Sequence, residues 1–266
     1  MSTAVTLTGV PETMLWTLHG RAGEDGQANP VLHDPDCVRI YKSIDYDYHR
    51  SFGPPDRGLA VRAAAFDDAL RPWLRDHPGG TVIELAAGLE TQMLRCDDGL
   101  VRWLAVDVPD AVAVRERFLP STPRHRCLPV SALDRAWFDE VDAARGVFVS
   151  AQGLFMYFSE SEVRALCARI LDRFPGATLV FDVVPRWFSR KTQEGHALTE
   201  YYTTPRMPWG VDCGEVGPLV RSWSARITGV SVLAYGPSRG VVPAATLDRM
   251  PMLRDLLPSI VRVGSA

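Results

Sequence analysis

The sequence predicts an α/β fold with a Rossmann-like, doubly wound and mostly parallel sheet. Three observations lead to this prediction. Short apolar runs alternate with helical patterns through most of the chain. The segment Thr81–Pro109 has the pattern of a strand, a glycine-bearing loop, a helix and a second strand. A chain of 266 residues with 46% hydrophobic content can bury the core of one large domain.

The elements before this segment form a helical lead-in, which we expect over residues 1–75. Residues 20–58 are rich in Gly, Pro, Asp and Tyr, which predicts irregular or short-helical structure. From Leu59 to Leu74 the apolar residues fall at helical spacing, and His77–Gly80 ends that helix before the first strand. We expect this helix to cover the edge of the sheet.

Strands and helices alternate after the central segment. A helix is predicted over Ala111–Phe118, and a second begins at the capping box of Ser159 and Glu162. Residues 185–222 break the alternation with aromatic residues and with several charges around Pro205 and Pro208, so we expect an inserted substrate cap over the site. The further strands are expected at Cys127–Val130, Gly146–Ser150, Ala177–Val184, Ala225–Leu233 and Val241–Leu247.

The loop after the first strand predicts a nucleoside cofactor. Gly88 allows the backbone to approach a bulky ligand, and Asp107, 19 residues later at the next strand's end, can accept both hydroxyls of a ribose. A dinucleotide loop has the pattern G-x-G-x-x-G, whereas the three positions here hold Ala86, Gly88 and Thr91. This disfavours NAD and an oxidoreductase. S-adenosylmethionine has no pyrophosphate, and it is therefore the predicted cofactor.

Charge and cysteine content exclude several classes of function. The net charge is −3, with 29 basic and 32 acidic residues interleaved, so no basic stripe indicates binding to nucleic acid or to an anionic membrane. Five single cysteines indicate neither a disulfide framework nor a metal site. No apolar run is long enough to span a membrane, and no secretion signal is evident, so we expect a cytoplasmic protein with a small-molecule acceptor.

Five motifs run through most of the chain: Leu59–Arg62, Phe66–Asp67, Ile83–Thr91, Ser131–Asp134 and Gln152–Tyr157. Together they resemble the leucine carboxyl methyltransferase superfamily, especially its bacterial polyketide O-methyltransferases. The resemblance implies a single class I S-adenosylmethionine-dependent methyltransferase domain over residues 1–266. It also implies that the enzyme methylates a carboxylate or hydroxyl of a small, polyketide-like metabolite.

The resemblance also implies roles for individual residues. Arg62 would hold the cofactor carboxylate, with Lys42 or, less favoured, Arg39 assisting. Asp107 would bind the ribose. The methionine part would lie against the loop from Glu84 through Ala86 and Gly88 to Glu90, the adenine beside Leu133 and Asp134, and the sulfonium near Gln152. Ala86 and Glu90 depart from the family's G-x-G-x-D-T pattern, and an alanine in place of the first glycine is expected to have a negative φ angle.

Candidate acceptor contacts lie in two regions. Tyr157 follows the fourth predicted strand, where a buried structural tyrosine is an equal alternative. The predicted cap supplies the others, which are Tyr201, Tyr202, Arg206 and Trp209. A carboxylate acceptor needs no general base, whereas a phenol benefits from one, for which His196 is the candidate. A cofactor-binding protein that no longer methylates is the second interpretation.

Overall fold

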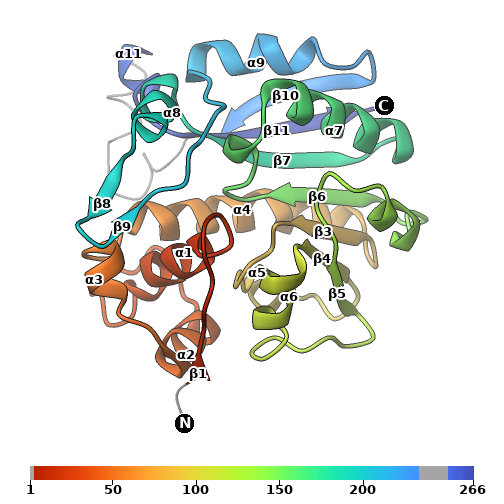
Figure 1. The fold of residues 1–266 in the computed structure, drawn as a ribbon. Helices are drawn as coiled ribbons and strands as arrows, with labels where there is room; N and C mark the ends of the chain where they lie inside the picture. Colours follow the sequence, from red (N-terminus) through yellow and green to blue (C-terminus); the bar gives the residue numbers. More distant parts are fainter. Residues whose placement is uncertain (1–2, 234–250) are drawn as a thin grey trace.

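The computed structural model describes residues 3–233 and 251–266. In this part of the chain, the main sheet has seven strands in the order β10-β11-β7-β6-β3-β4-β5 (Figure 1). Strand β11 is antiparallel to both of its neighbours, and all the other pairs are parallel. The Rossmann-like, mostly parallel fold is therefore confirmed. The strands are β3 (Thr81–Leu85), β4 (Arg102–Asp107), β5 (His125–Pro129), β6 (Val147–Ala151), β7 (Thr178–Val183), β10 (Ile227–Leu233) and β11 (Ser259–Ser265).

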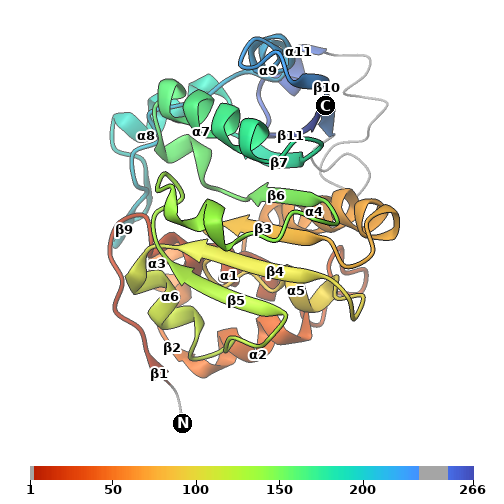
Figure 2. The same ribbon diagram turned by 90° about the vertical axis from the view of Figure 1, so that its right-hand side faces the viewer.

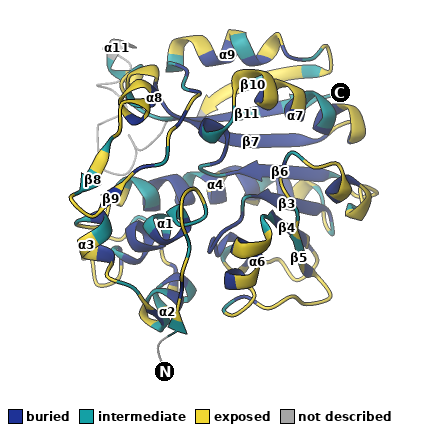
Figure 3. Cartoon of the chain, in the orientation of Figure 1, coloured by how far each residue is buried: buried dark blue, intermediate teal, exposed yellow. Residues whose placement is uncertain are grey.

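Helices cover both faces of the sheet, which is why the central strands are apolar on both sides. Every residue of β3 is buried: Val82 belongs to one hydrophobic core, whereas Ile83 and Leu85 belong to the other. Figure 3 shows these strands buried between helices whose outer surfaces are exposed. The first core packs against α1 (Thr13–Ala22), α4 (Arg57–Asp76) and α6 (Pro109–Arg115), and the second against η1 (Ala136–Glu140), α7 (Glu160–Arg173) and α9 (Cys213–Arg221).

Helix α4 extends the predicted helix by two residues at each end. It begins after Asp56, whose side chain accepts a hydrogen bond from the Gly58 amide. Phe66 and Leu70 lie in the same core as Phe148 and Ile260, which belong to the interior strands β6 and β11. The helix therefore covers a face of the sheet, and the expectation that it covers the edge is wrong.

The lead-in before α4 consists of short helices with local caps. Helix α2 (Pro35–Ser43) begins after Asp34, whose carboxylate accepts from the Cys37 amide, and α3 (Tyr48–Phe52) follows Asp47, which caps it in the same way. The two-residue strands β1 (Thr3–Ala4) and β2 (Ile44–Asp45) pair in parallel. None of the helices in the described ranges has both the length and the apolar character of a membrane span.

The second half of the chain follows the predicted alternation closely. Ser159 and Glu162 form the capping box of α7, with both reciprocal hydrogen bonds present. The short elements η2 (Phe155–Tyr157) and α5 (Gln92–Arg95) follow β6 and β3. Strand β10 matches one predicted closing strand, whereas the other, Val241–Leu247, lies outside the described residues. Beyond that segment lie α11 (Pro251–Arg254) and β11, a strand that was not predicted.

Residues 185–222 form α8 (Arg186–Gln193), a hairpin of β8 (Ala197–Thr199) and β9 (Tyr202–Thr203), and α9. The hairpin docks on α3 of the lead-in, because the Thr199 hydroxyl donates to the carbonyls of Arg50 and Ser51 at 2.8 and 2.9 Å. Figure 1 shows the hairpin beside α3, although the two are about 150 residues apart in the sequence. Helix α9 belongs to the layer that covers the sheet.

Candidate active site

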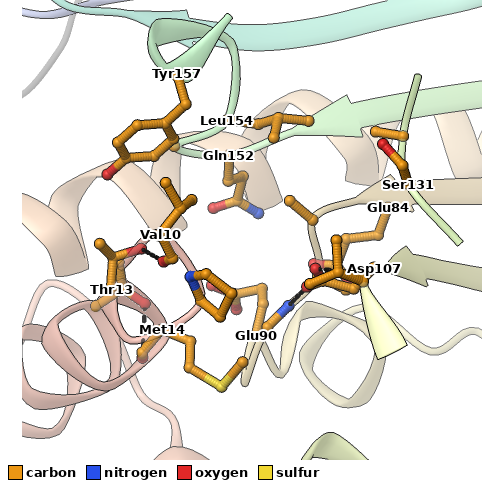
Figure 4. A pocket seen from close by; sticks show the side chains of 18 of the residues that line it. Val10, Thr13, Met14, Glu84, Glu90, Asp107, Ser131, Gln152, Leu154 and Tyr157 are labelled. Carbon is orange, nitrogen blue, oxygen red and sulfur yellow. Dashed lines mark hydrogen bonds between the residues drawn. The ribbon is translucent and has the colours of Figure 1, made fainter. Parts of the chain in front are cut away.

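A cavity of about 280 Å³ lies at the carboxyl ends of β3, β4 and β6 (Figure 4). The parallel strands β6, β3, β4 and β5 all end at this edge, as their arrowheads in Figure 2 show. The strand order reverses direction between β3 and β6, and ligands of open α/β sheets bind at such a point. Eight predicted site residues line the cavity, namely Arg62, Glu84, Ala86, Gly88, Glu90, Asp107, Gln152 and Tyr157.

The loop after β3 has an unusual backbone. Ala86 has a φ angle of 54°, so the expectation of a negative angle is wrong. An L-residue in this left-handed region costs roughly 1–2 kcal/mol of free energy, and the contacts that hold the two ends of the loop must outweigh this cost. The Ala86 amide donates to the Val106 carbonyl at 2.8 Å. Gly88 follows with a φ of 46°, and a side chain there would lie 2.9 Å from Cβ of Met14. The loop thus requires glycine at Gly88 but tolerates alanine at Ala86.

Asp107 joins this loop to the end of β4. Its Oδ2 accepts from the Gly88 amide and its Oδ1 from the Val108 amide, both at 2.8 Å. Burial raises the pKa of Asp107, against the opposing effect of these two amide hydrogen bonds. A carboxylate offers about four lone-pair positions, so acceptor capacity remains for a ligand in the cavity that Asp107 lines.

Two buried oxygen atoms of the lining have no hydrogen-bond donor: Oε1 of Glu84 and Oε1 of Gln152. The other carboxylate oxygen of Glu84 accepts from the Trp103 indole at 3.2 Å and lies 3.6 Å from the Arg115 guanidinium. Burial raises the pKa of Glu84 to about 7 in spite of the favourable charge of Arg115. A buried acceptor without a donor is costly, so this arrangement favours a cationic hydrogen-bond donor in the cavity.

Arg62 reaches the cavity from α4. One of its guanidinium nitrogens donates to Asp182 at 3.2 Å, and Asp182 also accepts from the Gly153 amide at 2.6 Å. Gly153 has a φ of 69°, and a side chain there would lie 2.8 Å from Nη1 of Arg62. The absence of a side chain at Gly153 therefore makes room for the guanidinium beside the cavity.

Glu90 has a mainly structural environment although it lines the cavity. Its Oε1 lies 3.2 Å from Arg21, 2.8 Å from Arg95 and 2.9 Å from the Thr91 amide. Burial opposes ionisation of this group, but the charges of Arg21 and Arg95 outweigh burial and lower the pKa of Glu90 to about 2. The longer glutamate, in place of the aspartate of the G-x-G-x-D-T pattern, thus anchors the loop to residues behind it.

Arg115 is a loop-positioning residue that was not identified from the sequence. It is fully buried on α6, and its Nη1 donates to the carbonyls of Gly88 and Glu90 at 2.9 and 2.8 Å. A buried arginine among apolar helix residues is a weak signal in one sequence, because most arginines are exposed. Together with its 3.6 Å approach to Glu84, these bonds fix the loop relative to the end of β3.

The N-terminal segment forms another wall of the cavity, which was not predicted as part of the site. Its members on α1 and the preceding turn are Val10, Pro11, Thr13, Met14 and Thr17. Val10, Met14 and Thr17 have the spacing of one helical face, and this pattern in the sequence could have identified the wall. Figure 4 shows Thr13 and Met14 opposite Gln152 and the end of β6. None of residues 185–222 lines this cavity, so their expected role as a substrate cap stays a prediction.

Three residues predicted to contact the cofactor lie outside the cavity lining. The side chain of Lys42 is 67% exposed and pairs with Asp25 at 3.1 Å, since α2 directs it to the surface. Asp134 is exposed and accepts from the Ala136 amide at the start of η1, and Leu133 packs against the core. The cavity is lined instead by Ser131 and Ala132, two residues earlier in the same loop.

The five residues predicted in the cap also lie outside the lining of the cavity. Trp209 is buried in the core, with its ring centroid 6.0 Å from that of Trp223. Its amide donates to the Met156 carbonyl, which holds it beside η2. Tyr202 packs against Phe52 of α3 at 4.8 Å. His196 lies edge-on to Phe188, and burial together with the nearby Lys191 lowers its pKa. Tyr201, beneath the Arg50 guanidinium, and Arg206 are both exposed.

Tyr157 lines the cavity from η2. Burial raises its pKa to about 12, and the nearby Thr13 side chain acts in the opposite direction. The hydroxyl therefore remains protonated and can donate near neutral pH. No group of three or more His, Cys, Asp and Glu side chains in the described ranges could hold a metal ion.

Comparison with known proteins agrees with this geometry. A family model described as leucine carboxyl methyltransferase matches residues 21–171. The chain is 32% identical to the tetracenomycin polyketide synthesis O-methyltransferase TcmP of Streptomyces glaucescens, over 79% of this chain and 78% of the relative. It is also 32% identical to the S-adenosyl-L-methionine-dependent methyltransferase dpfgK of Gibberella zeae, over 64% of this chain and 63% of that protein.

The fold is also similar to solved methyltransferase structures. The S-adenosylmethionine-dependent methyltransferase SibL in its apo form superposes with a TM-score of 0.52 at 12% identity, over 79% of this chain and 57% of that chain. At this identity the likeness concerns the fold alone.

Proposed function

The chain belongs to the leucine carboxyl methyltransferase family and uses S-adenosylmethionine, and from this premise we propose that it methylates an oxygen atom of a small organic acid. The observation that carries the proposal is one cavity that combines Asp107, Arg62 and the two buried acceptors without donors, on Glu84 and Gln152.

The cavity has the donors and acceptors that the cofactor requires. The unsatisfied oxygens of Glu84 and Gln152 suit an α-ammonium group, which supplies three donors. Arg62 suits the α-carboxylate, with which a guanidinium can form two parallel hydrogen bonds. Asp107 suits the ribose hydroxyls. The acidic groups outnumber the basic one in the lining, which matches the net positive charge of a sulfonium amino acid.

The residues around the cavity support methyl transfer by positioning. The bound cofactor supplies an electrophilic methyl group on a positively charged sulfur. Val10, Pro11 and Met14 on one side and Leu154 and Phe158 on the other form apolar walls, which exclude water from the path of the nucleophile. An in-line approach then depends mainly on how rigidly these walls hold the acceptor. The Tyr157 hydroxyl can hold an acceptor oxygen by donating to it.

The composition of the lining favours a carboxylate acceptor over a phenol. No histidine lines this cavity within the described part of the chain, and His196, the predicted base, lies outside it. A carboxylate is already ionised near neutral pH, whereas a phenol with a pKa of about 10 must lose a proton. The name of TcmP associates that relative with polyketide synthesis, which supports an organic acid of the polyketide type as the acceptor.

Calorimetric titration with S-adenosylmethionine tests the cofactor site. Asp107→Ala should weaken binding by at least about 100-fold, because at least two charge-assisted hydrogen bonds of about 1.5–3 kcal/mol each are lost. Asp134→Ala is the matched control, since this aspartate lies on the adjacent loop outside the cavity, and it should bind like the wild type. Equal affinity of both variants would refute the assignment of Asp107.

Methyl transfer from labelled cofactor to naphthoic acid and to naphthol tests the acceptor class. Formation of the methyl ester without methylation of naphthol would support a carboxylate acceptor. Faster methylation of naphthol would contradict it. Tight cofactor binding without transfer to any member of a wider panel of aromatic acids and phenols would favour the second interpretation, a cofactor-binding protein that does not methylate.

A further inference from the structure

A buried ionic cluster lies behind the loop after β3 and connects it to the lead-in. We call it the Arg21 cluster; it consists of Arg21, Asp34, Asp67, Glu90, Thr91 and Arg95. Arg21 donates to Thr91 at 2.9 Å and to the Leu89 carbonyl at 2.8 Å. Arg95 donates to Asp34 at 2.6 Å and to Asp67 at 2.8 Å.

The cluster is almost completely removed from solvent. The side chains of Arg21, Asp34 and Arg95 are 1%, 3% and 5% exposed. Burying such ion pairs costs desolvation, so they contribute little to stability compared with apolar residues of the same volume. The ion pairs instead determine relative positions, because each guanidinium forms several hydrogen bonds at once in defined directions. The Arg21 cluster therefore specifies an arrangement of elements.

The arrangement that it specifies is the distance between α1 and the cofactor loop. Arg21 lies on α1, four residues after Thr17 and seven after Met14, and so on the same face of the helix. Thr17 and Met14 line the cavity, and Met14 packs directly against Gly88. Arg21 holds the other end of this face against residues 89–91. One helix thus forms the acceptor-side wall and is fixed to the loop that binds the cofactor.

We propose that Arg21 is a positioning residue for methyl transfer, which couples the α1 wall to the cofactor loop so that cofactor binding orders both. This rests on the proposed function. Arg21 itself does not line the cavity, and it acts through Glu90, Thr91 and the Leu89 carbonyl. Since a displacement of about 1 Å can reduce a rate by about 100-fold, a wall that follows the loop is a direct way to maintain the in-line geometry.

Hydrogen exchange with and without S-adenosylhomocysteine tests the coupling without requiring an acceptor. In the wild type, this ligand should increase protection both in residues 86–91 and in α1. In Arg21→Met, the increase should persist in the loop but disappear in α1, and Arg21→Lys should restore at least half of it by recovering the charge. A purely structural role would lower protection with and without ligand alike and leave the increment unchanged.

Two further variants make the test independent of folding defects. Thr91→Val keeps every charge but removes the hydroxyl to which Arg21 and Arg95 each donate at 2.9 Å. It should also reduce the increase in protection of α1, and it replaces Arg21→Met in the test if that variant does not fold. Arg126→Gln breaks an exposed ion pair with Glu140 and should behave like the wild type. The proposal would be overturned if a folded Arg21→Met showed the full ligand-dependent increase in protection of α1. If Arg21→Met does not fold, the same result in Thr91→Val would overturn it. Failure of the ligand to bind the wild type would refute the proposed function, and the positioning role with it.

Discussion

Cofactor affinity should depend on pH through Glu84. The raised pKa of this buried carboxyl, about 7, means that much of it is protonated in the ligand-free protein near neutral pH. An ammonium group binds only the ionised form at Oε1, so the apparent dissociation constant is multiplied by the ratio of total to ionised carboxyl. For a pKa of about 7, that ratio changes about tenfold between about pH 8 and about pH 6. Affinity should therefore fall about tenfold on acidification.

Titration calorimetry with S-adenosylhomocysteine at these two pH values provides the assay. Glu84→Gln should bind more weakly at high pH and should lose most of the pH dependence, since the amide does not titrate. Glu160→Gln, at an exposed position on α7, should retain the wild-type dependence. The reasoning would be refuted by a flat pH profile in the wild type or by an unchanged slope in Glu84→Gln.

The same raised pKa has a consequence for folding. Because the folded pKa exceeds the unfolded value, Glu84 favours folding at low pH, and this contribution is lost as the pH rises through about 7. A shift from 4.5 to about 7 corresponds to on the order of 3 kcal/mol. In urea denaturation without ligand, Glu84→Gln should therefore gain stability relative to the wild type as the pH rises.

Three further substitutions have defined outcomes. Glu90→Ala should lower the free energy of unfolding by about 3–5 kcal/mol in urea denaturation, because it leaves two buried guanidinium groups without this partner; a loss below about 1 kcal/mol would contradict the role of the ion pairs. Ala86→Gly should raise the free energy of unfolding by about 0.5–1 kcal/mol, since relief of the positive φ exceeds the added entropy of the unfolded chain; destabilisation would argue against strain there. His196→Ala should leave the rate of methyl transfer unchanged, and a large loss would restore it as a candidate base.

Most of the fold could be predicted because the local patterns and the tertiary environment agree. The capping box at Ser159 and the periodic residues of α7 define that helix in the sequence as they do in the structure. The face covered by α4 could not be predicted, because helical periodicity gives the apolar side but not the partner strand. The apolar residues of β11 are interrupted by Arg262, so this strand lacks the continuous apolar run that is typical of an interior strand.

The cofactor half of the site was more predictable than the acceptor half. Asp107, Gly88 and Glu84 lie within a single strand-loop-strand unit, so their proximity follows from local geometry. The α1 wall is about 70 residues from this loop in sequence, and its approach depends on buried ion pairs such as that of Arg21 with Glu90. A single sequence does not show which distant charges pair. Exposure is equally nonlocal, which explains why Lys42 and Arg206 were expected near the ligand.

The position of β11 in the sheet imposes an order on biosynthesis. In the described part of the chain, β10 pairs with β11, and β11 alone connects it to β7. As the polypeptide leaves the ribosome, β10 emerges before the strand that must separate it from β7. Meanwhile the edge of β7 is open, and Ile260 and Val261, which will be fully buried, have not yet been added. The nascent protein therefore exposes an unpaired sheet edge until residues 259–265 have left the ribosome, and we expect chaperone binding and aggregation to be concentrated in this interval.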